Sequence, residues 1–120
     1  MSPGSEPRRV LLVEDDSLVA MLVEDMLDEI GYAPHDNPAT VAAALTAVAK
    51  GGFDLAILDV NLAGQPVFPV AEALDAVDIP FVFASGYGAG GLPDAWASRP
   101  VVAKPFLLED LEAGLAGLAQ

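Results

Sequence analysis

The chain has 120 residues, of which 53% are hydrophobic, and its 18 acidic and five basic residues give a formal net charge of −13. This length suits one domain with its own core, and the absence of cysteine excludes disulfides, thiolate metal sites and a cysteine nucleophile. The negative charge would repel a phosphate backbone, so direct binding to nucleic acid is not expected.

No apolar run reaches the roughly 18 residues of a membrane span, and residues 1–7 lack the apolar stretch of a secretory signal. We therefore expect a cytoplasmic protein that is not embedded in a membrane. It would consist of a flexible tail at residues 1–7 and one domain at residues 8–120.

Short apolar runs alternate with amphipathic segments along the chain. Strands are predicted at residues 10–13, 32–35, 55–58, 80–84 and 101–103, the second of them at a sheet edge. Helices are predicted at about residues 17–30, 38–50, 70–77 and 107–118, with only a short helix at 93–97 because residues 85–91 are rich in glycine. Asn37-Pro38 is expected to cap the second helix. This alternation predicts an α/β fold, a five-stranded parallel sheet with helices on both faces.

The first predicted helix carries more apolar residues than one buried face needs. They are Leu18, Val19, Leu22, Val23, Met26, Leu27 and Ile30. A broad contact with the core is the preferred interpretation, and a surface for docking a partner is the alternative.

Polar side chains follow four of the predicted strands. Glu14 and Asp15 come after the first strand, Asp59 after the third, Ser85 after the fourth and Lys104 after the fifth. Right-handed crossovers bring these strand ends to one edge of the sheet, where open α/β sheets bind ligands. Converging carboxylates repel one another, and Mg²⁺ prefers such oxygen ligands. The pattern predicts a site for an anionic group beside a metal, with Asp59 as nucleophile and with Lys104 and Ser85 offsetting charge.

The acidic residues also have simpler interpretations. Asp59 alone could cap the turn that follows it. Glu14, Asp15 and Asp16 could all favour the dipole of the next helix. We assign only Asp16 to that role.

The order of these residues resembles the receiver domain of response regulators in two-component signalling, over about residues 8–118. The resemblance implies a flavodoxin-like receiver fold, (βα)5, in which Asp59 is the phosphoacceptor, Ser85 and Lys104 assist it, and the Lys104-Pro105 bond is cis. It also implies Mg²⁺ as the cofactor and a set of oxygen ligands for it: Asp15, Asp59, the backbone carbonyl of Asn61 and, through water, Glu14.

Residues 80–87, Pro-Phe-Val-Phe-Ala-Ser-Gly-Tyr, are similar to a subclass of single-domain receivers with a Phe-Ala-Thr-Gly-Tyr motif. That subclass also has a glycine-rich stretch and a shortened fourth helix. Two positions depart from typical receivers. Val101 stands where an aromatic residue rotates on phosphorylation, and Tyr87 is a candidate switch residue in its place, with simple packing as the alternative. Leu107 stands where a helix-capping serine is expected.

The resemblance implies a bacterial signalling protein and not an enzyme: a single-domain response regulator, monomeric or weakly dimeric. It would take a phosphoryl group onto Asp59 from a sensor histidine kinase or phosphotransfer protein, and its output would be contact with a downstream protein or onward phosphotransfer. His35 is interpreted as a surface residue, not a phosphodonor, and Trp96 as a packing residue.

Two alternatives remain open. One is a receiver-like protein-binding module that is never phosphorylated. The other is a phosphotransferase of the haloacid-dehalogenase class, which is disfavoured because the aspartate nucleophile of that class follows the first strand.

Overall fold

The computed structural model describes residues 7–62, 64–86 and 92–118. Residues 1–6 of the expected tail, and Tyr87 with most of the glycine-rich stretch, lie outside the described residues.

The main sheet has five strands in the order β2-β1-β3-β6-β7, and every neighbouring pair is parallel. Its strands are β1 (Arg9–Val13), β2 (Ala33–Asp36), β3 (Leu55–Asp59), β6 (Phe81–Ser85) and β7 (Val101–Ala103). The central strands are almost wholly apolar because both faces of a parallel sheet are covered, and β3 is buried at every position. The strand order reverses at β1, so the crevice between the ends of β1 and β3 is the switch point where such sheets bind ligands.

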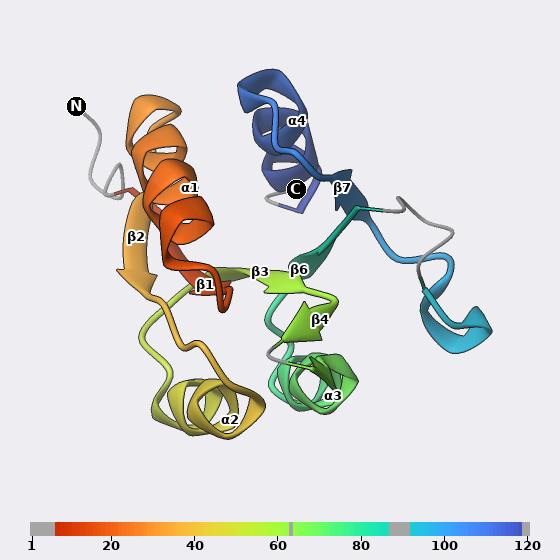
Figure 1. Cartoon of the computed structure of the whole chain (residues 1–120). Coiled ribbons are helices and arrows are strands. Elements are labelled where there is room, and N and C mark those ends of the chain that lie inside the picture. The colour runs from red at the N-terminus through yellow and green to blue at the C-terminus, as the bar shows by residue number, and fades with distance from the viewer. Residues whose placement is uncertain (1–6, 63, 87–91, 119–120) are drawn as a thin grey trace.

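Among the described residues, two helices cover each face of this sheet. Figure 1 shows α1 (Ser17–Glu29) and α4 (Leu108–Leu118) on one face, and α2 (Val41–Lys50) and α3 (Phe68–Ala76) on the other. The described residues between β6 and β7 contain only a short 3₁₀ helix, η2 (Asp94–Trp96), where a short helix was predicted. The predicted α/β fold is confirmed. Within the described ranges, no helix is both long and apolar enough to cross a membrane.

The two faces of the sheet have separate apolar cores. The core under α2 and α3 contains the buried aromatic residues Phe53, Phe81 and Phe83. The core under α1 and α4 is mainly aliphatic. On that side α4 lies so close to β7 that a Cβ atom at Gly114 would be 2.8 Å from Cγ2 of Val102.

The contact of α1 with the core is narrower than predicted. Ala20, Val23 and Leu27 are its buried residues, whereas Leu18, with 76% of its surface exposed, and Leu22, with 52%, face solvent. The preferred interpretation, a broad core contact, is therefore wrong for Leu18 and Leu22, because the apolar stripe is wider than the face that packs on the sheet.

The predicted start of the second helix is also wrong. Thr40 caps α2, and its hydroxyl accepts a backbone hydrogen bond of 3.1 Å. Asn37 and Pro38 instead hold the preceding loop against the end of β1. The backbone N–H of Glu14 donates to the Pro38 carbonyl at 3.3 Å, and the Asn37 side-chain amide, once turned so that its nitrogen faces β1, donates to the Glu14 carbonyl at 3.2 Å. Local capping propensity was outweighed by these tertiary contacts.

A small antiparallel pair, β4 (Asn61–Leu62) and β5 (Gln65–Pro66), lies between β3 and α3. This pair was not predicted from sequence, because two-residue strands have too little apolar alternation to detect. Gly64 in the connecting turn has φ of +82°, a backbone conformation that favours glycine.

Candidate functional site

The polar residues that were predicted at the strand ends lie at one edge of the sheet. Glu14 directly follows β1, Asp59 and Ser85 are the last residues of β3 and β6, and Lys104 directly follows β7. All except Lys104 are buried, with exposed fractions of 8% or less. Parallel pairing of these strands brings together residues that are up to 90 positions apart along the chain.

Lys104 joins two of the carboxylates. Its Nζ lies 3.0 Å from Oε2 of Glu14 and 3.3 Å from Oδ1 of Asp59. The other Glu14 oxygen, Oε1, accepts a hydrogen bond of 3.1 Å from the backbone N–H of Asp16. Lys104 is fixed in turn by its own backbone N–H, which donates to the Ser85 carbonyl at 3.0 Å. The bond to Pro105 is cis, as the resemblance implied.

Three carboxylates converge beside this lysine. One oxygen each from Glu14, Asp15 and Asp59 lies within 4.8 Å of the others. Asp15 is exposed, whereas the other two are buried. A set of carboxylate oxygens suits a hard divalent cation such as Mg²⁺, so the residues present fit the predicted metal. Asp16 takes no part and caps α1, accepting hydrogen bonds from the backbone N–H groups of Leu18 and Val19, as expected.

Burial and the neighbouring charges change the acidity of the site. Burial raises the pKa of Asp59 to about 6; the negative charge of Glu14 adds to this rise and Lys104 opposes it. Burial by itself would lower the pKa of Lys104, but hydrogen bonding to Glu14 and the charges of Asp59 and Glu14 outweigh it, so the pKa of Lys104 is raised. A carboxylate with a raised pKa in a crevice is a frequent mark of a functional site.

The structure places the remaining predicted residues as follows. Asn61 is exposed on β4, two residues after Asp59. Val101 is half-buried on β7 and is paired in register with Phe83. His35 is exposed on β2. The predicted role of Tyr87 falls outside the described residues.

Sequence reasoning missed an aromatic group beside the site. The ring centroid of Trp96 lies 6.0 Å from that of Phe68 and 5.8 Å from that of Phe83. Trp96 is therefore a packing residue, but it packs on α3 and β6 and not only on its own short helix. The placement of Phe68 directly before Pro69, at the start of a helix, was the available signal, since that position leads from the Asp59 loop into α3.

Comparison with known proteins places this arrangement in a class. No protein-family model matches the chain. The transcriptional regulatory protein RprY of Bacteroides fragilis (strain YCH46) is 28% identical in an alignment of 118 positions that covers 88% of this chain. The match covers 47% of RprY, so the chain spans about half the length of this curated relative.

Solved structures show the class directly. The receiver domain of the PhyR response regulator from Erythrobacter litoralis is 27% identical, with a TM-score of 0.84 over 98% of this chain and 93% of that domain. The chain belongs to the receiver-domain family of response regulators, and it has the flavodoxin-like receiver fold. SdrG from Sphingomonas melonis Fr1 is 44% identical, with a TM-score of 0.84 and full coverage of both chains.

Two further structures bear on the site. SdrG has also been solved in a conformation activated by BeF3. The receiver domain of the sensor histidine kinase PA1611 from Pseudomonas aeruginosa PAO1 was solved with a magnesium ion in its active-site cleft. That domain is 21% identical, with a TM-score of 0.77, and the match covers 93% of this chain and 97% of that domain. At this identity the likeness concerns the fold alone.

Proposed function

We propose that Asp59 accepts a phosphoryl group from the phosphohistidine of a sensor histidine kinase or of a phosphotransfer protein. One observation carries the proposal: a buried carboxylate at the end of β3 lies 3.3 Å from a lysine ammonium that also pairs with Glu14. An inert aspartate in a turn would not need a half-buried lysine and a second, buried carboxylate beside it. Membership of a signalling family supports the same role.

In the proposed transfer, an Asp59 oxygen attacks phosphorus as the bond between phosphorus and the donor imidazole breaks. In this proposal Lys104 would neutralise charge on the phosphoryl oxygens, and the hydroxyl of Ser85 would donate to one of them. Asp59 must be ionised to attack, and its raised pKa disfavours the ionised form. A nearby cation would lower this pKa.

We propose Mg²⁺ as the cation. Asp15, Asp59 and the backbone carbonyl of Asn61 would hold it directly, and Glu14 would act through water. The two Glu14 oxygens already have partners in Lys104 and the Asp16 N–H, which supports an indirect role for Glu14. When bound, the ion supplies positive charge to the carboxylates and to the phosphoryl oxygens.

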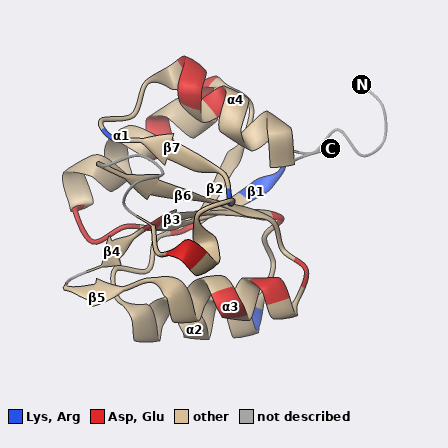
Figure 2. Ribbon diagram, turned by 90° about the vertical axis from the view of Figure 1, so that its right-hand side faces the viewer, with Lys and Arg blue, Asp and Glu red and all other residues tan. Residues whose placement is uncertain are grey.

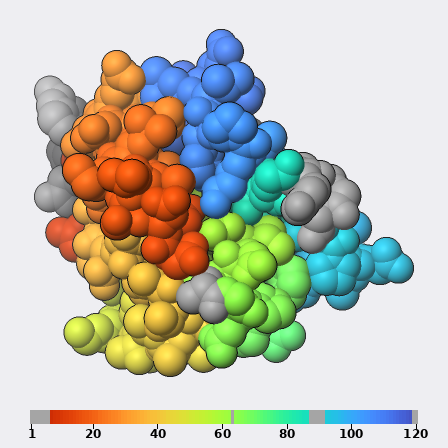
Figure 3. Space-filling model, viewed as in Figure 1, coloured from red at the N-terminus to blue at the C-terminus, as the bar shows by residue number. Residues whose placement is uncertain are grey.

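The phosphoryl donor is proposed to dock on the exposed side of α1. Leu18, Met21 and Leu22 expose 76%, 61% and 52% of their surfaces there. Beside them lies a groove of about 350 Å³, lined by Val19, Leu22, Lys104, Pro105 and Phe106. Figure 3 shows α1 and the segment that leads into α4 meeting on this face.

Two features indicate what this surface binds. Lys104 lines the groove and also contacts Asp59, so a protein seated there is next to the phosphoacceptor. The chain is strongly acidic, and Figure 2 shows acidic positions on both sides of the sheet and few basic ones. We therefore propose a donor with an apolar helix face flanked by basic residues. A downstream protein that reads the phosphorylated form completes the proposed pathway.

The test is intact-mass measurement after incubation with Mg²⁺ and acetyl phosphate, with Asp59→Asn as the control. One phosphoryl adduct on the wild type, removed by hydroxylamine and absent from Asp59→Asn, is the expected result. No adduct, together with no binding of beryllium fluoride, would contradict the proposal and leave a receiver-like binding module. The motif at residues 80–87 supports assignment to the receiver subclass with the Phe-Ala-Thr-Gly-Tyr motif.

A further inference from the structure

Val101 stands where typical receivers have an aromatic switch residue, and it lies next to a group of aromatic rings. Val101 is paired in register with Phe83, and the side chains of Phe68, Phe81 and Trp96 surround Phe83 with ring-centroid distances of 5.7, 5.3 and 5.8 Å. Phe81 and Phe83 are buried in β6 and fixed there. Phe68 is only half-buried, so it is the ring on the sheet-facing side of α3 that has room to move.

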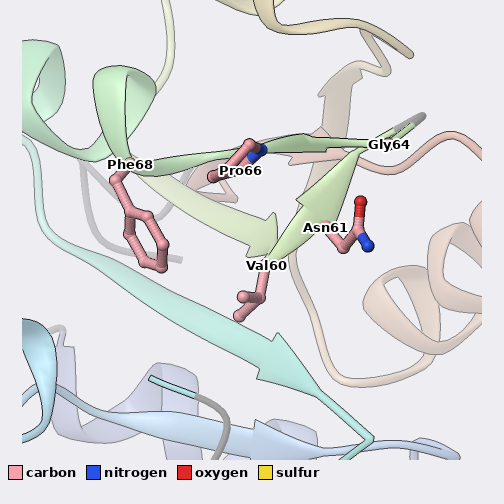
Figure 4. A pocket seen from close by; sticks show the side chains of 5 residues that line it. All are labelled: Val60, Asn61, Gly64, Pro66 and Phe68. Carbon is pink, nitrogen blue, oxygen red and sulfur yellow. The ribbon is translucent and has the colours of Figure 1, made fainter. Parts of the chain in front are cut away.

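A hollow lies beside Phe68 on the side of the Asp59 loop. It has a volume of about 220 Å³ and is lined by Val60, Asn61, Gly64, Pro66 and Phe68. A cavity of about 150 Å³ is enough to hold benzene, so the hollow is large enough for the Phe68 ring. Figure 4 shows the Phe68 and Val60 side chains projecting from the same side of the β4–β5 pair. The Phe68 ring is stacked on Trp96 in this structure, and the hollow is the space beside it that is large enough to receive the ring.

Short backbone links connect this ring to the phosphoacceptor. Val60 directly follows Asp59, and its N–H donates to the Ala84 carbonyl at 3.2 Å. The Val60 carbonyl accepts a hydrogen bond of 3.0 Å from Val67, the residue before Phe68. Val67 is the N-cap of α3, so this hydrogen bond joins the first turn of α3 to the residue that follows Asp59. A displacement of the backbone next to Asp59 therefore reaches Phe68 directly.

The far side of the ring connects to a second segment. Phe68 and Trp96 are stacked with an interplanar angle of 15°. The Arg99 guanidinium lies 5.1 Å from the Trp96 ring and forms an ion pair with Asp75 of α3. Loss of the Phe68–Trp96 stack would leave η2 attached to α3 mainly through Arg99. The position of Phe68 thus determines how firmly η2 is held to α3.

We propose that Phe68 is the switching aromatic of this chain. With Asp59 free, its ring stacks on Trp96. With a phosphoryl group on Asp59 and a cation held by the Asn61 carbonyl, the Val60–Asn61 backbone is drawn toward the site, and the ring moves into the hollow. The inference rests on the proposed function, because phosphorylation of Asp59 is the input of the switch.

The test uses the single tryptophan of the chain. The full chain is labelled with 5-fluorotryptophan, and fluorine NMR spectra are recorded with Mg²⁺ alone and with Mg²⁺ plus beryllium fluoride. The fluoride signals report occupancy of the Asp59 site, and the labelled Trp96 reports the ring stack in the same sample. We expect a bound fluoride signal together with a new Trp96 resonance, and neither in Asp59→Asn.

Two variants separate the switch from general loosening. In Phe68→Leu the bound fluoride signal should remain, whereas the change at Trp96 should be lost. In Phe81→Leu, which removes another ring near Trp96 (6.3 Å between centroids) that does not line the hollow, the change should persist.

A bound fluoride signal without any change at Trp96, or an unaltered change in Phe68→Leu, would overturn the switch and leave the proposed function intact. No bound fluoride in the wild type would overturn both.

Discussion

The two helical layers of this domain are built differently. Under α2 and α3 the core is rich in aromatic residues and connects through Phe68 to η2. Under α1 and α4 the core is mainly aliphatic, and α1 leaves two leucines and a methionine in solvent. The Asp59 site lies at the edge of the sheet that both layers share.

This difference separates two tasks. An exposed apolar face next to Lys104 is suited to receiving a protein, because it has surface left to bury. A close-packed aromatic group is suited to transmitting a change, because packed rings adopt discrete arrangements and not a continuum. In the proposed function, signal input and signal output would therefore use opposite faces of one small sheet.

The largest expected effect comes from opening the aromatic core. Phe83→Ala should lower the free energy of unfolding by about 3–5 kcal/mol, since Phe83 is fully buried and contacts three rings. Leu22→Ala on the opposite layer should change it by less than about 0.5 kcal/mol because its side chain is half exposed. Urea unfolding followed by circular dichroism measures both. Equal losses would show that the layers do not differ as described.

The next effect concerns the site between the layers. Without metal, native Asp59 binds its proton with a pKa of about 6, whereas the ordinary pKa of an aspartate, which applies to the unfolded chain, is 3.8. The native state therefore binds more protons between about pH 4 and pH 6, and the free energy of unfolding should fall as the pH rises through that range. The gap of about two pKa units corresponds to at most about 3 kcal/mol.

Asp59→Asn should remove this dependence and be more stable than the wild type at pH 7 in EDTA. Asp25→Asn, which makes the same charge change at an exposed position of α1, should keep the wild-type pH profile. Unfolding free energies that do not vary with pH in the wild type would rule out a raised pKa at Asp59.

A smaller effect, on the rate of phosphotransfer from a donor protein, should distinguish the two helical layers. Leu22→Ala should slow phosphotransfer from a phosphorylated donor protein about tenfold, equivalent to about 1.4 kcal/mol, with no change in labelling by acetyl phosphate. Leu45→Ala, at an exposed leucine of α2 on the other layer, is the matched control. If both substitutions slow transfer alike, α1 is not the docking face.

The smallest effects should come from the helix caps, one on each layer. Asp16 caps α1 with two hydrogen bonds, and Thr40 caps α2 with one. Replacing either residue by alanine should cost about 1 kcal/mol, with the larger loss at Asp16. Differential scanning calorimetry of the two variants provides the comparison, and a larger loss at Thr40 would reverse it.

Much of the fold was accessible from sequence because buried strands and amphipathic helices leave strong periodic patterns. The end of β3 at Asp59 and the position of Lys104 after β7 were predicted from such patterns, and the structure brings the two side chains together. Their chemical roles remain predictions. Strand periodicity locates a residue at the sheet edge, but it does not define what the residue does there.

The features that were not predicted from sequence depend on contacts between segments that are far apart along the chain. The start of α2 was misplaced because Pro38 bonds to Glu14, 24 positions away, and such tertiary bonds override capping propensity. The Phe68–Trp96 stack joins a helix start to a short 3₁₀ helix, and no local pattern signals this pairing. The exposed side of α1 was wrongly predicted to contact the core, because hydrophobicity alone does not distinguish a buried apolar residue from an exposed one.

The close approach of α4 to β7 determines which glycines of α4 can be replaced, by design or by evolution. At Gly114 any side chain would collide with Val102, so even alanine should loosen the helix. At Gly117, one turn further on, an added Cβ would meet nothing within 4 Å, and alanine should stabilise the helix by up to about 1 kcal/mol. Two glycines in one helix thus have opposite tolerance: the first is constrained by packing, and the second is a position at which the domain can be made more stable.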